Sequence, residues 1–207
     1  MAITSKKPPI KETVGAQYIC FDKMDVNQDW TATFDEEVEK TEVVKNVSVT
    51  ENGETSKVYS SGIVYDTENQ TSSTEISVEV IAFDDETLAK MRGDNVDTAG
   101  LILSGGSRPR PYFAYGKVVK LKGGKLRLDW YPKCKLTENT DETATKEDTF
   151  SEQTDTLTIT ALPFNEAGDI VSRVASGVNW PEGLTEEKFF SKPILTAADL
   201  ASVVKSV

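Results

Sequence analysis

The side chains that could do chemistry in this 207-residue chain are carboxylates, lysines, tyrosines and two cysteines, because histidine is absent. Without histidine, the serine–histidine and cysteine–histidine nucleophile systems cannot form, and the commonest metal ligand is missing. Cys20 and Cys134 match no metal-binding or redox spacing. We therefore expect two reduced thiols, no catalytic residues, and no resident metal or cofactor. We expect that the chain is not an enzyme.

Two short stretches partly match known binding motifs. DVNQDWTATFDE, residues 25–36, has acidic or amide side chains at positions one, three, five and twelve of a calcium-binding loop. Position six of such a loop requires glycine, but the residue there is Trp30. LSGGSRPRP, residues 103–111, is rich in glycine but lacks the lysine and spacing of a phosphate-binding loop. We interpret the first stretch as a polar loop that anchors Trp30, and the second as a turn-rich connection.

The charge balance excludes two classes of partner. Acidic residues outnumber basic ones by 34 to 23, which gives a net charge of −11. Specific nucleic-acid binding needs a cationic surface against the phosphates, and so does docking onto an anionic membrane. No apolar run approaches the length of a membrane helix, and the N-terminus, MAITSKKPPIKET, lacks the apolar core of a secretion signal. We expect a protein that is made in a cytoplasm and contacts no membrane.

Most of the chain has the two-residue alternation of β-strands. We predict a strand at 15–23 and another at 156–164. Long strands at 37–50 and 55–66 flank Asn52-Gly53, a dipeptide typical of tight hairpin turns. A second hairpin is predicted from PYFAYGKVVKL, residues 111–121, and KLRLDWYPKCKL, residues 125–136, with Gly123-Gly124 at its turn.

The strand predicted at 74–83, TEISVEVIAF, alternates most clearly, and a turn is predicted just before it at 67–73. Its apolar face comprises Ile76, Val78, Val80 and Ala82. Its polar face includes Glu75 and Glu79. Such a strand is typical of a sheet with one buried side and one side in water.

FDDETLAKMRG, residues 83–93, carries the signals of one short helix in this β-rich chain. Acidic residues from Asp84 open it, basic residues close it, and Gly93 follows as a stop signal. Leu88 and Met91 are three residues apart and form a narrow apolar stripe. We predict a helix at about 84–92 whose Leu88 and Met91 pack against the sheet, covering one of its open ends.

These elements predict a mainly β fold, sandwich-like or barrel-like, with one short central helix and short C-terminal helices. We divide the chain into an N-terminal arm (1–14), a β domain (15–183) and a C-terminal helical arm (184–207). The acidic segment at 137–155 is predicted to be either a mobile loop or a long exposed β-arm. Thr185 and Thr196 are predicted N-caps of the two C-terminal helices.

The order of these elements resembles the major tail protein, or tail tube protein, of long-tailed bacteriophages, most of all those that infect Gram-positive bacteria. Three stretches within about residues 15–190 carry the resemblance: TEISVEVIAFDDETLAKMRG, PYFAYGKVVKLKGGKLRLDWYPKCKL and DTLTITALPF. The resemblance implies a β-sandwich with one helix. It also implies homohexameric rings in which each copy lends part of its sheet to a closed luminal barrel.

The resemblance further implies a function as a structural protein of the virion. Rings would stack into the tail tube, with loops and terminal arms between them, and DNA would pass through the lumen during ejection without specific binding. The implied partners are other copies of the chain, the tape measure protein, the tail terminator and the distal tail protein. On this interpretation, the arm at 1–14 and the segment at 137–155 gain order on assembly.

A lumen that conducts DNA should repel phosphates, so we expect its wall to be net negative. Our candidate lumen-facing residues are Glu39, Glu42, Glu75 and Glu79. A wall lined instead by Lys45, Lys57, Lys117 and Lys120 would contradict this expectation.

Two alternatives remain open from the sequence. The first is a β-sandwich that acts as a binding or decoration module on a phage particle or a cell surface. It would use an exposed aromatic cluster, for which Trp30, Trp130 and Tyr131 are the candidates. The second is an enzyme that works with carboxylates. The oligomeric state of the purified protein separates these alternatives from the tube best.

Overall fold

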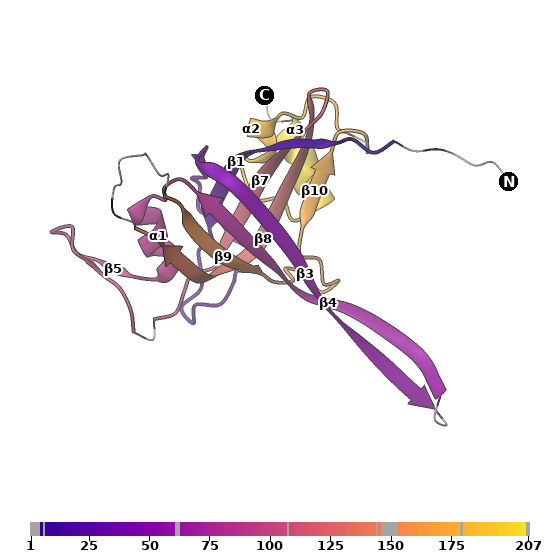
Figure 1. Ribbon diagram of the computed structural model, residues 1–207, viewed down its shortest axis with the longest axis horizontal. Coiled ribbons are helices and arrows are strands. Elements are labelled where there is room, and N and C mark those ends of the chain that lie inside the picture. Colours follow the sequence, from indigo (N-terminus) through magenta and orange to yellow (C-terminus); the bar gives the residue numbers. More distant parts are fainter. Residues whose placement is uncertain are drawn as a thin grey trace.

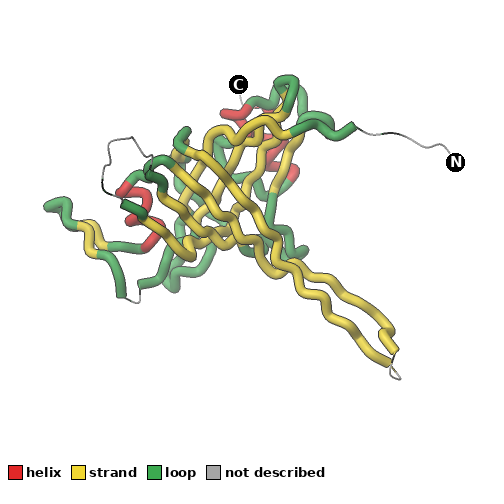
Figure 2. The backbone as a smooth tube through the Cα atoms, viewed as in Figure 1, coloured by secondary structure: helices red, strands yellow, loops and turns green. Residues whose placement is uncertain are grey.

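The computed structural model describes residues 5, 7–60, 63–106, 108–143, 145, 153–178 and 180–205, with the backbone alone given for 54–60 and 63–71. Within these residues the chain is mainly β (Figures 1 and 2), which confirms the predicted fold class. The strands are β1 (Lys11–Phe21), β2 (Glu39–Thr41), β3 (Val44–Ser60), β4 (Ile63–Val80), β5 (Asn95–Val96), β6 (Ile102–Leu103), β7 (Phe113–Leu121), β8 (Lys125–Asp141), β9 (Asp155–Ala161) and β10 (Ser172–Ala175). The helices are α1 (Asp85–Arg92), α2 (Glu186–Phe189) and α3 (Ala197–Lys205).

One antiparallel sheet of eight strands organises the molecule. Its order is β2–β1–β7–β8–β9–β4–β3, and β10 pairs with β8 outside this path. β2 and β3 lie at opposite ends of the sheet, yet only Glu42 and Val43 separate them in the sequence. Because consecutive Cα atoms are about 3.8 Å apart, the two ends lie within about 11 Å of each other. The sheet therefore curls almost into a barrel without closing, and we call the gap between β2 and β3 the seam.

An apolar core fills the inside of the curl. The inward side chains of five strands form it, among them Ile19, Ile76, Tyr115, Leu136 and Ile159. The alternation of TEISVEV places Ile76, Val78 and Val80 inside, as predicted, whereas Ala82 lies beyond the end of β4 and is exposed.

α1 packs against this interior core. Asp84 caps its first turn, because its carboxylate accepts a hydrogen bond from the backbone N–H of Thr87 at 2.9 Å. Gly93 ends the helix in the left-handed region, with φ of 69°. Met91 is fully buried in the core, whereas Leu88 is only half-buried against it.

A second core lies on the outer side of the sheet. There the C-terminal segment covers β1, β7 and β8, and Phe190 stacks on Tyr18 with ring centroids 3.9 Å apart. The indole N–H of Trp130 donates to the carbonyl oxygen of Phe189 at 3.1 Å. Gly116 is needed below this aromatic cluster, because a Cβ atom at that position would come within 2.6 Å of the Phe190 ring.

The C-terminal helices begin where the sequence predicts. The Thr185 hydroxyl accepts from the Lys188 N–H at the start of α2. At the start of α3, Thr196 and Asp199 cap each other: each backbone N–H donates to the other side chain, at 3.0 and 3.2 Å. Both arrangements satisfy N–H groups that have no partner within the helix.

The first predicted hairpin is wrong in its turn. Asn52-Gly53 does not reverse the chain: β3 continues to Ser60, which pairs with Ile63 at the start of β4, and residues 61–62 lie outside the described residues. The predicted turn at 67–73 is likewise part of β4. The two turn-like stretches face each other across the hairpin, with Asn52 opposite Ser73 and a register shift just after it. These residues therefore form a local irregularity within the paired strands instead of a turn, because the hydrogen bonds of continued strand pairing outweigh their preference for a turn.

Other boundaries also differ from the prediction. The strand predicted at 37–50 is broken at Glu42-Val43, where the chain crosses the seam from β2 to β3. β1 begins at Lys11, inside the segment predicted as an arm. The acidic segment at 137–155 supplies the end of β8, up to Asp141, while residues 144 and 146–152 lie outside the described residues.

Candidate functional site

One outer surface of the sheet carries short polar side chains and has no helix over it in Figure 1. We call it the bare face. It consists of the outward residues of β3, β4, β9 and the adjoining end of β8: Asn46, Ser48, Thr50, Glu75, Ser77, Glu79, Lys135, Thr137, Glu138, Thr140, Thr156, Thr158 and Thr160. They form cross-strand rows, because Ser77 lies opposite Ser48 on one side and opposite Thr158 on the other. The Thr137 and Thr160 hydroxyls are hydrogen-bonded at 2.6 Å.

The four candidate acids do not form one surface. Glu75 and Glu79 lie on the bare face, while Glu39 belongs to β2 and Glu42 to the link across the seam. The Glu39 carboxylate accepts from the Thr87 hydroxyl at 2.6 Å. Glu42 lies 3.3 Å from the Lys40 ammonium group.

The lysines weighed against these acids are also scattered. The Lys45 ammonium group lies 4.0 Å from the Glu79 carboxylate, beside the bare face. Lys117 is buried inside the curl and Lys120 is exposed on β7. The side chain of Lys57 lies outside the described residues.

β3 and β4 extend well beyond the sheet. Residues 74–80 of β4 pair with β9 on one side and β3 on the other, but residues 63–73 pair with β3 alone. This two-stranded extension, which we call the overhang, comprises residues 53–60 and 63–71 and projects away from the body in Figure 1. At about 3.3 Å per residue, its eight-residue strand spans about 26 Å. The sequence analysis placed the turn at the base of the overhang, at Asn52-Gly53, and so missed its length.

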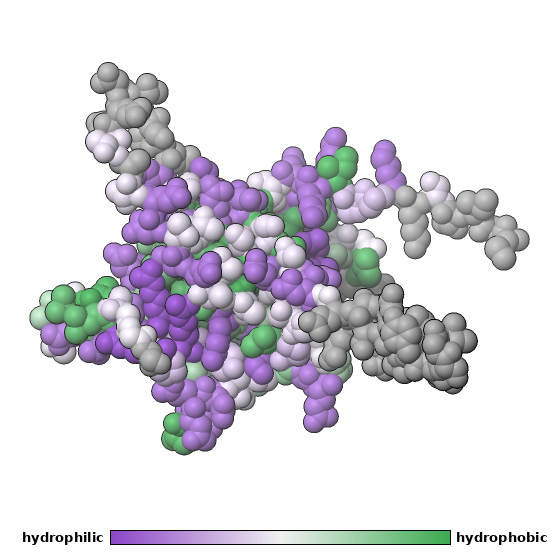
Figure 3. Space-filling view, turned by 60° about the horizontal axis from the view of Figure 1, so that its bottom comes forward, coloured by the Kyte–Doolittle hydropathy of each residue, from purple (hydrophilic) through white to green (hydrophobic). Residues whose placement is uncertain are grey.

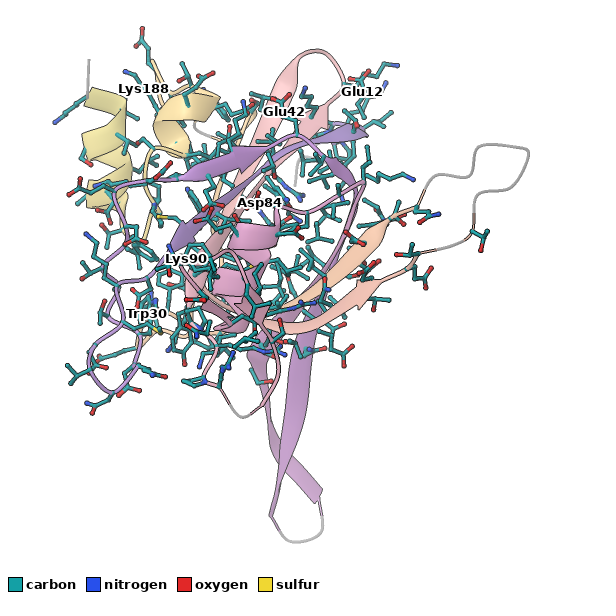
Figure 4. All side chains as sticks on the ribbon, turned by 90° about the vertical axis from the view of Figure 1, so that its left-hand side faces the viewer. Glu12, Trp30, Glu42, Asp84, Lys90 and Lys188 are labelled. Carbon is teal, nitrogen blue, oxygen red and sulfur yellow. The ribbon has the colours of Figure 1, made fainter. Side chains whose placement is uncertain are left out.

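A groove of about 840 Å³ opens at the seam, between β2 and α1. We call it the seam groove. Its walls are residues 37–41 and Val43 on one side, and residues 82–84 and α1 on the other, with Ile19 also lining it. The hydrogen bond between Thr87 and Glu39 spans it. Figure 4 shows Asp84 and Lys90 near opposite ends of α1, with Glu12, at the start of β1, well apart from both.

A buried charge cluster, which the sequence analysis did not identify, joins three strands. Asp129 on β8 has no exposed surface, and its carboxylate contacts Arg127 at 3.1 Å, Arg173 of β10 at 2.6 Å and Lys117 of β7 at 3.9 Å. Burial lowers the pKa of Lys117 to about 8, although Asp129 opposes this shift. The alternation in RLDWY, which places Arg127 and Asp129 on one face, was the available signal.

The aromatic candidates are mostly inside the molecule. Trp130 and Tyr131 are buried in the outer and inner cores, so neither offers an exposed contact. Trp30 is half-buried, with the Lys133 ammonium group 4.9 Å from its ring. Four exposed apolar side chains gather instead at the β5–β6 hairpin (Figure 3, green at the left): Val96, Leu101, Ile102 and Leu103.

The loop at 25–36 is held by hydrogen bonds between its own residues. The Asp25 carboxylate accepts from the backbone N–H groups of Asn27 and Asp29, at 2.9 and 2.8 Å. Among the described residues, no cluster of three or more histidine, cysteine or acidic side chains is arranged to hold a metal ion. Within the same part of the chain, no helix is long and apolar enough to cross a membrane.

No family model and no curated protein matches the chain. Among solved structures, one similar chain belongs to the anti-feeding prophage baseplate, determined by electron cryomicroscopy with sixfold symmetrisation. The superposition has a TM-score of 0.44 and 8% sequence identity, and it covers 82% of this chain and 97% of that one. A likeness at this level assigns neither a family nor a function.

Proposed function

We propose that the chain is a structural, non-enzymatic subunit of a phage tail tube. Copies join through sheet edges into sixfold rings, the rings stack into a tube in the virion, and DNA passes through its lumen. The sequence resemblance motivates this proposal, and the overhang is the structural observation that carries it.

An isolated two-stranded hairpin is marginally stable in water. The overhang has two strands and no third strand within the described residues, and its edges leave backbone N–H and C=O groups unpaired. A sheet edge of a neighbouring copy would supply the missing pairing. β2 and β3, the two ends of the sheet, offer such edges on every copy.

The bare face suits the lumen of such a tube. Hydroxyls and the carboxylates of Glu75 and Glu79 line it, so it offers phosphates few cationic partners. One lysine on this face and one beside it are already engaged: the Lys135 ammonium group lies 4.0 Å from the centre of the Tyr112 ring, and that of Lys45 lies 4.0 Å from the Glu79 carboxylate. We propose Glu75 and Glu79 as luminal residues, and we place Glu39 and Glu42 at the seam.

The β5–β6 hairpin favours a second candidate, a binding or decoration module on a phage particle or cell surface. Its exposed aliphatic side chains form an apolar tip that a partner protein could cover. Such a module would remain a monomer or a small oligomer, and shortening the overhang would leave its binding unchanged.

The decisive experiment removes the overhang. Deleting residues 54–72 joins Asn52-Gly53 to Ser73, which leaves a three-residue hairpin loop containing glycine. Sedimentation velocity and electron microscopy over a concentration series should show rings or tubes for the intact chain and folded monomers for the variant. A matched control deletes the exposed residues 98–100 at the tip of β5–β6 and should assemble normally. A monodisperse intact monomer, or normal assembly of the overhang variant, would contradict the proposal.

A further inference from the structure

The N-terminal residues have a charge opposite to the rest of the chain. MAITSKKPPIK, residues 1–11, contains three lysines and no acidic residue, although the whole chain has a net charge of −11. Ser5 and residues 7–10 are exposed, and β1 begins directly after them. A short basic segment at the end of an acidic protein suggests an acidic partner surface.

The seam groove is the acidic recess of the molecule. Its lining includes Glu37, Glu39, Asp84 and Glu86. A smaller recess of about 340 Å³ adjoins it, shares Glu37 and Glu39, and adds Asp35 and Glu36. Three lysines also line the two recesses: Lys23, Lys40 and Lys90.

Two of these lysines are already neutralised by nearby acids. Lys40 contacts Glu42 at 3.3 Å and Glu186 at 3.7 Å, and Lys90 contacts Asp35 at 3.2 Å. Among the described residues, Glu37 and Glu86 form no ion pair, and they face the groove from opposite walls. The groove therefore keeps an unbalanced negative charge on both sides.

The groove also contains an unused strand edge. β2 pairs with β1 through residues 39–41, and its other edge has no strand partner within the described part of the chain. The side-chain oxygen of Thr41 is buried there without a hydrogen-bond partner. An extended segment lying along β2 could pair with its backbone, and residues 1–7 can do so because the first proline is Pro8.

The geometry favours a segment from a second copy over the segment of the same copy. The groove touches Ile19, whereas the basic segment leaves β1 at Lys11, eight residues or about 26 Å away along the strand. In Figure 1 the start of β1 (indigo) and α1 lie on opposite sides of the body of the molecule. The segment of the same copy would spend most of its length returning along β1. Groove and segment on opposite sides give a head-to-tail contact, which links copies into rings or filaments.

We propose that residues 1–7 of one copy lie in the seam groove of the next copy, with Lys6 and Lys7 against Glu37 and Glu86. This proposal rests on the proposed self-assembly and names the surfaces that carry it out. The complementary charges bring the segment to the groove, and pairing with β2 sets its register.

A labelled peptide tests the groove without requiring assembly. The peptide MAITSKKPPIK is titrated into the full-length chain, and its fluorescence anisotropy is followed. Glu37→Lys with Glu86→Lys should weaken binding at least about tenfold, and a peptide with Lys6→Glu and Lys7→Glu should bind this variant better than the natural peptide does. The matched control, Glu138→Lys with Glu166→Lys, reverses two exposed acids away from the groove and should bind normally. Equal affinity for the groove and control variants would overturn the proposal.

Assembly of full-length variants separates this inference from the proposed function. The Lys6→Glu, Lys7→Glu chain should need at least about a tenfold higher protein concentration to assemble than a control with Lys122→Glu and Lys125→Glu at the exposed β7–β8 turn. If intact and arm-variant chains assemble equally, the docking inference fails and the tube proposal stands. If the intact chain forms head-to-tail dimers or open chains but neither rings nor tubes, and the peptide binds the groove, the tube proposal fails and the docking proposal stands. An intact chain that remains a monomer at all concentrations contradicts both.

Discussion

The two outer surfaces of the sheet differ, although both halves of the sheet bury apolar side chains on their inner side. Around β7 and β8 the outward residues include Val118, Leu128 and Trp130, and the C-terminal segment covers them. On the bare face most outward residues are serine, threonine and glutamate, with Asn46 and Lys135 among them, and no element of the described chain packs over them. The sheet is therefore covered on both sides around β7 and β8, and only on its inner side at the bare face. The type of the outward residues decides whether a segment covers the outer side, because only an apolar outer face gains from being covered.

The two halves of the sheet therefore contribute differently to the free energy of folding. The covered half stabilises the chain itself, since large aromatic side chains are buried there. The bare face contributes little burial on its outer side, so changes there should affect contacts with other molecules more than folding.

Phe190→Ala should destabilise the chain by about 3–5 kcal/mol, because it empties the centre of the outer core. Urea unfolding followed by tryptophan fluorescence measures this, since Trp130 lies against Phe190. A loss below about 1 kcal/mol would mean that the C-terminal segment is not a stabilising layer.

Met91→Ala should cost about 2–5 kcal/mol, because Met91 is fully buried in the inner core. Leu88→Ala should cost clearly less, about 1–2 kcal/mol, since Leu88 is only half-buried. Denaturant unfolding of both variants gives the comparison. Equal losses of stability in the two variants would contradict the half-buried position of Leu88.

Lys117→Met should change how stability depends on pH. The folded chain releases the Lys117 proton near pH 8, whereas the unfolded chain keeps it to about pH 10. In this window the unfolded state binds more protons, so the stability of the natural chain relative to the variant should rise by up to about 1.4 kcal/mol per pH unit. Burial raises the pKa of Cys20 and Tyr131 to about 12, which destabilises both proteins alike at high pH. Parallel stability curves between pH 7 and 10 would contradict the prediction.

Ser77→Ala and Thr158→Ala should change stability by less than about 0.5 kcal/mol, because both side chains lie on the outer side of the bare face. Thermal unfolding checks this on the isolated subunit. A loss of about 2 kcal/mol from either substitution would show that side chains of the bare face stabilise the fold, and the contrast between the two halves would then be wrong.

Local signals in the sequence predicted much of the fold. Asp84 and Gly93 mark the ends of α1 correctly because capping depends on neighbours within a few residues. The β7–β8 hairpin and the inward face of β4 were also predictable, since alternation directly reports which side of a strand is buried. Of the candidate site, the sequence indicated Glu75 and Glu79 as outward residues of one strand, and this alternation is present in the structure.

The sequence alone determined the mainly β fold class, the bounds of α1, the acidic balance and the absence of histidine. Three features emerge only from the folded chain: the length of the first hairpin, the position of β2 and β3 at the two ends of one curled sheet, and the contacts of Asp129 with cations on three strands. The physical reason is the range of the interactions. Caps and alternation act over a few residues, whereas strand register, the seam and a buried ion cluster depend on which distant segments pair.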